Sequence, residues 1–235
     1  MLMLSLRSNG NWSAYRKISG NKFCHKNRNM AAFTLAEVLI TLGIIGVIAA
    51  LTLPTVINNI GEKSNIVALK KFYAEFYNAT NMIKTEYEDP SYWKLKDNNA
   101  QSADWVMDRY KEHLSIQRIC GAGDSSCMNF PIYSYNTKQA VITQSQYESW
   151  SLRGFILNNG MTGFFDVNNG NFSVFVDVNG FKNPNTLGID VFAWAVNNQG
   201  KIVRYTDPSL NYSGNDNPEY NYAFEIMENG WEKKY

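Results

Sequence analysis

An apolar segment between Phe33 and Ile57 constrains this chain more than any other feature. It reads FTLAEVLITLGIIGVIAALTLPTVI, and Glu37 is its only charged residue. A helix needs about 20 apolar residues to cross a bilayer, and this segment reaches that length. The apolar region of a cleaved secretory signal is shorter, about 7–15 residues, and is followed by a small-residue cut site. We therefore predict that the segment is retained as a membrane-spanning helix.

The 32 residues before this segment form a basic leader that contains no Asp or Glu. Its six basic residues are Arg7, Arg16, Lys17, Lys22, Lys26 and Arg28. Of the chain's 22 basic residues, 16 therefore remain in 33–235, against 21 acidic residues. Because basic residues beside an apolar span favour the cytoplasmic side, the long remainder is predicted to lie outside the cytoplasm. Its mildly acidic balance gives no electrostatic reason to expect nucleic acid as a partner.

Glu37 is the unusual residue of the apolar segment. A carboxylate in lipid is costly, and such residues are commonly functional. In one interpretation Glu37 lies at the membrane interface and reaches water. In the other it pairs with a cation, and the N-terminal amine of a neighbouring subunit would serve if the chain were cut just before Phe33. The small residues Ala31 and Ala32 precede that position.

The run Phe33-Thr34-Leu35-Ala36-Glu37, followed by an apolar stretch, resembles the signal of type IV pilins and type II secretion pseudopilins. In that family a prepilin peptidase cuts before the Phe and methylates the new amine. The Glu then pairs with the amine of the adjacent subunit during fibre assembly on an inner-membrane platform. The resemblance implies cleavage between Ala32 and Phe33 and an assembly role for Glu37. The family usually has Gly where this chain has Ala32, which is also small.

The segment after the span, 58–89, has an amphipathic pattern. Apolar residues recur at spacings of three and four, which is typical of a half-buried helix. They are Leu69, Phe72, Phe76, Ala79 and Ile83. We predict a helix to about Glu88, before Pro90, as the stalk of an outer domain. Pro54 lacks an N–H and is expected to kink or open this long helix, with further loosening near Gly61.

The outer domain, 90–235, contains two cysteines, Cys120 and Cys127, separated by six residues. The third cysteine, Cys24, would leave with the leader. Outside the cytoplasm a pair of cysteines favours a disulfide. Zinc would need two further ligands, so we predict that Cys120 and Cys127 are bonded.

The rest of the outer domain predicts an antiparallel β-meander and two short helices. Ser102 is expected to cap a helix over 103–114, with His113 on a solvated face. A second helix is expected between Asn217 and Gly230. Asn- and Gly-rich turns separate most of the predicted strands, which cover 154–157, 161–167, 171–178, 189–196 and 201–205. One sheet face should pack on the stalk helix, which gives a pilin-like α+β fold.

The loop 177–190 is rich in Asp and Asn, and it is the best candidate for an ion site. Oxygen ligands from Asp177, Asn179 and Asp190 would suit Ca²⁺, and major pseudopilins carry calcium in a loop of this region. The loop does not fit an EF-hand. The alternative is a turn in which the Asp and Asn side chains bond their own backbone.

Two functions compete. The first is a non-enzymatic fibre subunit, a pilin or pseudopilin, in the bacterial inner membrane with a cytoplasmic N-terminus and its head in the periplasm or at the cell surface. The alternative is a single-pass membrane-anchored binding protein that needs no cleavage before Phe33. An anchored hydrolase ranks last, since His113 is the only histidine after the leader and no common catalytic motif occurs.

Overall fold

The computed structural model describes residues 33–88, 90–93, 95, 100–150, 152–168, 170–210 and 217–235. The leader, including Ala32 and Cys24, lies outside the described residues. The chain divides into two compact units, Met1–Ala49 and Ala50–Tyr235.

The N-terminal helix α1 runs from Leu35 to Tyr87. It ends where the sequence predicts, and Glu88 follows in a left-handed conformation with φ of 65°. The expected opening at Pro54 and Gly61 is wrong, because every residue through this region is helical. A proline removes one backbone hydrogen bond, and the bonds of the flanking turns are sufficient to keep the helix continuous.

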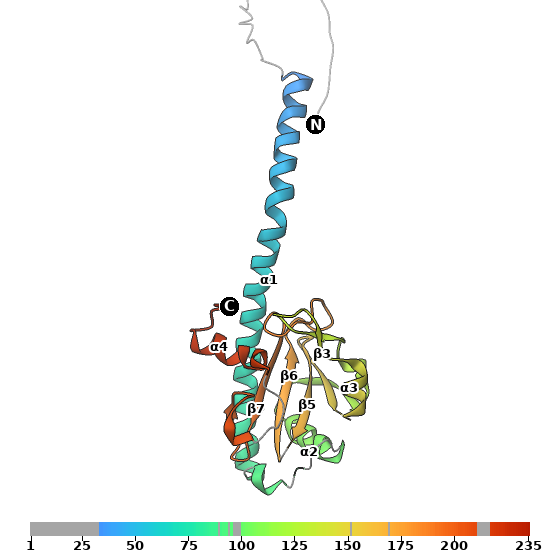
Figure 1. Cartoon of the computed structure of the whole chain (residues 1–235), viewed down its shortest axis with the longest axis vertical. Coiled ribbons are helices and arrows are strands. Elements are labelled where there is room, and N and C mark those ends of the chain that lie inside the picture. The colour runs from blue at the N-terminus through green and yellow to red at the C-terminus, as the bar shows by residue number, and fades with distance from the viewer. Residues whose placement is uncertain are drawn as a thin grey trace, which may run out of the picture. The chain divides into compact units, whose positions relative to one another are not determined.

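The second unit is built around a six-stranded antiparallel sheet (Figure 1) with strand order β1-β4-β5-β6-β7-β8. The predicted meander corresponds to β4 to β8, and it is confirmed. The strand β1 was missed, because all but one of its residues are at least partly exposed and it lacks an alternating pattern. The bounds are Ile116–Ala122, Arg153–Leu157, Thr162–Asn168, Asn171–Asp177, Val191–Val196 and Ile202–Val203.

The outer half of α1 packs on one face of this sheet, as predicted (Figure 1). Phe72 of α1 lies 5.6 Å from Trp194 of β7, measured between ring centroids. Phe172 and Val174 of β6 belong to the same core. Because side chains alternate along a strand, Ser173 and Phe175 of β6 face the opposite way, and Phe175 belongs to a second core. The architecture is therefore α+β and pilin-like.

Smaller elements pack around the sheet, with α2 against β4 and β5 and α4 against β7. The helix α2 spans Ala100–Tyr110, so Ser102 lies inside it and the predicted cap is wrong.

His113 was predicted to be solvated, but only 8% of its side chain is exposed, and its ring lies 3.0 Å from the Glu86 carboxylate of α1. The C-terminal helix α4, predicted from its flanking residues, is present. The further elements are α3 (Gln144–Ser149), α4 (Tyr222–Glu228) and the β2–β3 hairpin (Ile132–Tyr133 and Ala140–Ile142).

Candidate functional site

The N-terminal end of α1 holds Glu37 in a reciprocal cap with Thr34. The Glu37 carboxylate accepts hydrogen bonds from the Thr34 backbone N–H at 2.8 Å and from its hydroxyl at 2.9 Å. The Glu37 N–H donates to the Thr34 hydroxyl at 3.2 Å. This is a capping box. We did not single out Thr34 from the sequence, although the Thr-x-x-Glu spacing is a recognised signal for it.

The helix beyond this cap presents an apolar surface. Phe33 is 85% exposed and Leu35 is 78% exposed. The large apolar side chains of the following turns are also exposed, and α1 is the one helix in the described ranges that is long and apolar enough to cross a membrane. A surface of this kind is normally covered by lipid or by other helices.

The loop between β6 and β7 brings together the three residues predicted as calcium ligands. Asp177 and Asp190 are both buried at 0% exposure. Asn179 connects them, because its N–H donates to Asp177 Oδ1 at 3.0 Å and its amide donates to Asp190 Oδ2 at 2.9 Å. Backbone N–H groups of Asn185 and Thr186 also donate to Asp190. Asp177 thus forms an Asx turn with Asn179, and Asp190 also bonds backbone N–H groups of the loop, as the alternative interpretation predicted.

Hydrogen bonding does not remove the electrostatic cost of this pair. Burial, and then the charge of Asp190, raises the pKa of Asp177 from 3.8 to about 8. Burial likewise raises the pKa of Asp190. Two buried carboxylates need a proton or a cation between them, and the buried Oδ1 of Asn179 has no hydrogen-bond partner among the described residues. These features fit a hard cation such as Ca²⁺.

The loop offers Ca²⁺ few charged ligands. Within the ranges that the structure describes, no three His, Cys, Asp or Glu side chains come together as a metal site. Ca²⁺ binds six to eight oxygens and accepts amide and backbone carbonyls. A site here would therefore use Asp177 and Asp190 for charge, with Asn179 and neighbouring carbonyls completing it.

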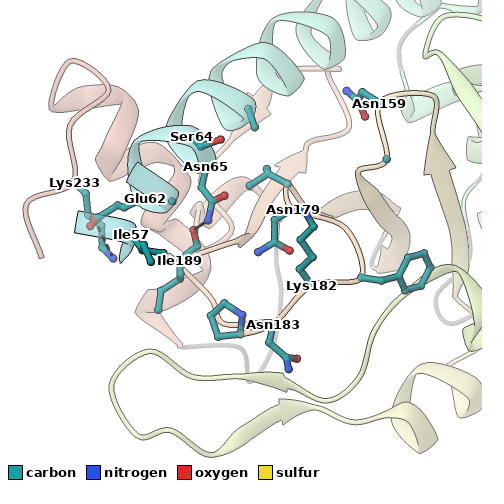
Figure 2. A pocket seen from close by; sticks show the side chains of 16 residues that line it. Ile57, Glu62, Ser64, Asn65, Asn159, Asn179, Lys182, Asn183, Ile189 and Lys233 are labelled. Carbon is teal, nitrogen blue, oxygen red and sulfur yellow. Dashed lines mark hydrogen bonds and ion pairs between the residues drawn. The ribbon is translucent and has the colours of Figure 1, made fainter. Parts of the chain in front are cut away.

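A cleft of about 1130 Å³ lies next to this loop. Figure 2 shows Ser64 and Asn65 of α1 on one side of it and Asn179, Lys182 and Asn183 of the loop on the other. The Asn65 amide donates to the carbonyl of Ile189 at 3.0 Å. Glu62 is the only carboxylate in the lining, which contains no His or Cys. The lining therefore offers hydrogen-bonding side chains together with the ion pair between Glu62 and Lys233.

Cys120 and Cys127 form a disulfide, as predicted. Cys120 belongs to β1, and Cys127 ends a short 3₁₀ helix, Ser125–Cys127. Both cysteines are buried. The bond closes a short loop onto β1, the edge strand of the sheet.

Removing this disulfide is expected to lower the free energy of unfolding by about 2–3 kcal/mol, because a short closed loop restricts the unfolded chain by that amount. The variant is Cys120→Ser with Cys127→Ser, and the measurement is denaturant unfolding of the full chain in detergent. Cys24→Ser is the matched control and should unfold as the unaltered protein does. An unchanged midpoint for the double variant would contradict the expectation.

One comparison with known proteins gives a match. The family model described as the prokaryotic N-terminal methylation motif matches residues 27–53. This is the signature of the signals of type IV pilins and pseudopilins, and the chain carries it. The match covers the end of the leader and the start of α1, and the pilin-like head lies beyond it. Comparison with curated proteins and with solved structures found no match.

Proposed function

We propose that this chain is a structural fibre subunit of the pilin or pseudopilin class. A prepilin peptidase removes residues 1–32 by cutting between Ala32 and Phe33, and the new amine is methylated. Residues 33–57 then serve as membrane anchor and as the assembly helix. Residues 58–89 are the stalk, and 90–235 form the head, in the periplasm or at the cell surface.

The observation that carries this proposal is the coincidence of the methylation motif with an exposed apolar helix. The matched residues, 27–53, include the junction and the first turns of α1. In those turns Glu37 is the one charged side chain. A neighbouring amine would meet a carboxylate at the helix end, and apolar neighbours would cover the exposed Leu and Ile side chains.

The signal belongs to a structural class that is generally non-enzymatic. We extend this to the present chain and propose that it has no catalytic activity of its own. Its partners would be the prepilin peptidase, other pilin or pseudopilin subunits and an inner-membrane assembly platform. Type IV pili and type II secretion pseudopili both suit this description.

Mass spectrometry of the N-terminus tests the cleavage. In cells with a prepilin peptidase, the mature chain is expected to begin at N-methylated Phe33, and without the peptidase the leader should remain. Ala32→Gly provides a matched variant, because it restores the family's usual residue, and it should be cut at least as completely. An intact leader in both strains would contradict the proposal and favour a single-pass anchored binding protein.

We also propose that the loop 177–190 binds Ca²⁺ through Asp177, Asn179 and Asp190. The support is the burial of two carboxylates and the unpartnered Oδ1 of Asn179 among the described residues. A bound cation would neutralise the pair and hold the loop that borders the cleft. Its function would then be structural.

A further inference from the structure

A second cavity, of about 290 Å³, opens on the face of the sheet that does not pack against α1. Phe164 and Asp166 of β5 line it, whereas Phe165 and Val167 point into the core beneath α1. Ligand cavities for drug-sized molecules occupy about 300–1,000 Å³. The volume of this cavity is just below that range, so it suits one ring-sized group rather than a long chain.

Aromatic side chains make up much of its wall. Phe164 and Phe175 are stacked with centroids 4.8 Å apart, and Tyr205 lies 4.7 Å from Tyr220. These four rings are almost fully buried. Trp150 differs, because it lines the cavity and is 36% exposed. An indole held partly in water offers an apolar face to a ligand.

The position of Trp150 is fixed by the local chain. It is the C-terminal cap of α3, and its N–H donates to the carbonyls of Gln146 and Glu148. The start of α3 is fixed by a capping box between Thr143 and Gln146. The indole and the Gln146 side chain are therefore carried by one short, capped helix at the mouth of the cavity.

Polar groups lie among the rings. The lining includes Asp166, Asn168 and Gln146. The Gln146 Oε1 already accepts two hydrogen bonds from Thr143, so Gln146 would act as a donor through its Nε2. Ser173 lies directly opposite Asp166 in the β5–β6 register but does not line the cavity itself. Ser173 is fully buried, and its hydroxyl has no hydrogen-bond partner within the described part of the chain. Burial, then the charge of Asp166, raises the pKa of Tyr220 to about 12, so its phenol remains protonated.

We propose that this cavity binds a single ring of a neutral saccharide. A sugar ring has an apolar C–H face, which would stack on Trp150, and an edge of hydroxyls. A carboxylate accepts hydrogen bonds from neighbouring hydroxyls, while amides can both donate and accept. The lining contains no Lys or Arg, so an anionic group would find no charge partner there. This binding is independent of cleavage and of fibre assembly.

The test uses the full chain in a detergent that carries no sugar. Saturation-transfer NMR is recorded with three neutral saccharides: maltotriose, cellotriose and the trisaccharide of N-acetylglucosamine. It is recorded separately with tetramethylammonium, an organic cation that aromatic rings and a carboxylate would also attract. At least one saccharide is expected to bind with a dissociation constant in the millimolar range. Trp150→Ala should weaken it about tenfold or more, Asp166→Asn should also weaken it, and Trp150→Phe should retain part of the affinity.

Phe181→Ala is the matched control, because Phe181 is 51% exposed and lines the other cleft. It should bind as the unaltered chain does. The near-ultraviolet circular dichroism of each variant must match the unaltered chain, which separates lost contacts from lost structure. The proposal is overturned if no saccharide binds, if Trp150→Ala binds as well as the unaltered chain, or if only tetramethylammonium binds.

Discussion

Glu37→Gln is expected to be cut at Phe33 and yet to yield no fibres. The substitution keeps the shape of the side chain and the hydrogen-bond acceptor that Thr34 uses. It removes the charge that would attract the amine of a neighbouring subunit. An amine left without its partner in an apolar setting costs about 3–5 kcal/mol. That is a factor of more than about a hundred in the affinity of each added subunit.

The measurement requires a host with the peptidase and the assembly platform. Sheared fibres are counted by electron microscopy and by blotting, and the N-terminus is checked by mass spectrometry. Glu62→Gln is the matched control, since Glu62 lies on the same helix and pairs with Lys233 at 3.6 Å within the outer unit. Normal fibres from Glu37→Gln would show that assembly does not depend on this carboxylate.

Much of the outer unit follows from periodicity in the sequence. The apolar spacing of Leu69, Phe72 and Phe76 predicted which face of α1 is buried, and all three are at 0% exposure. The strand β6 was predicted from the alternation of Phe172, Val174 and Val176. The strand β5 was predicted from the Asn- and Gly-rich turns on either side of it, and Gly160 and Gly170 in these turns do have positive φ. A periodic sequence pattern is sufficient to predict a helix or strand when one face of that element packs against a core.

The missed elements are those fixed by distant parts of the chain. The strand β1 is mostly exposed, and it pairs with a strand far along the sequence, Ile116 with Leu157 and Ala122 with Arg153 of β4. His113 is covered because α2 brings it against Glu86 of α1. The aromatic cavity joins Trp150 to Tyr205 and Tyr220, and no short sequence window contains all three. Such groupings depend on tertiary packing, which periodicity does not encode.

Without divalent cations, the head is expected to lose stability as the pH rises from about 4 to about 8. Asp177 has a pKa of 3.8 in its ordinary state and about 8 in the fold, so the folded state holds a proton that the unfolded state has lost. The contribution of this proton to the free energy of unfolding is therefore complete below pH 3.8. It is lost as the pH rises to about 8, by up to about 1.4 kcal/mol per pH unit. Denaturant unfolding in the presence of a chelator measures the slope.

Ca²⁺ should reverse this loss, because a cation stabilises the two ionised carboxylates that the proton otherwise neutralises. At about a hundred times its dissociation constant it would add about 2.7 kcal/mol, mainly at the higher pH. Asp177→Asn should flatten the pH slope and abolish the response, whereas Asp108→Asn, an exposed residue of α2, should keep both. If Ca²⁺ has no effect at any pH, the loop is a turn held by its own side chains. A pH slope would then remain without a calcium response, because burial of Asp177 does not depend on the ion.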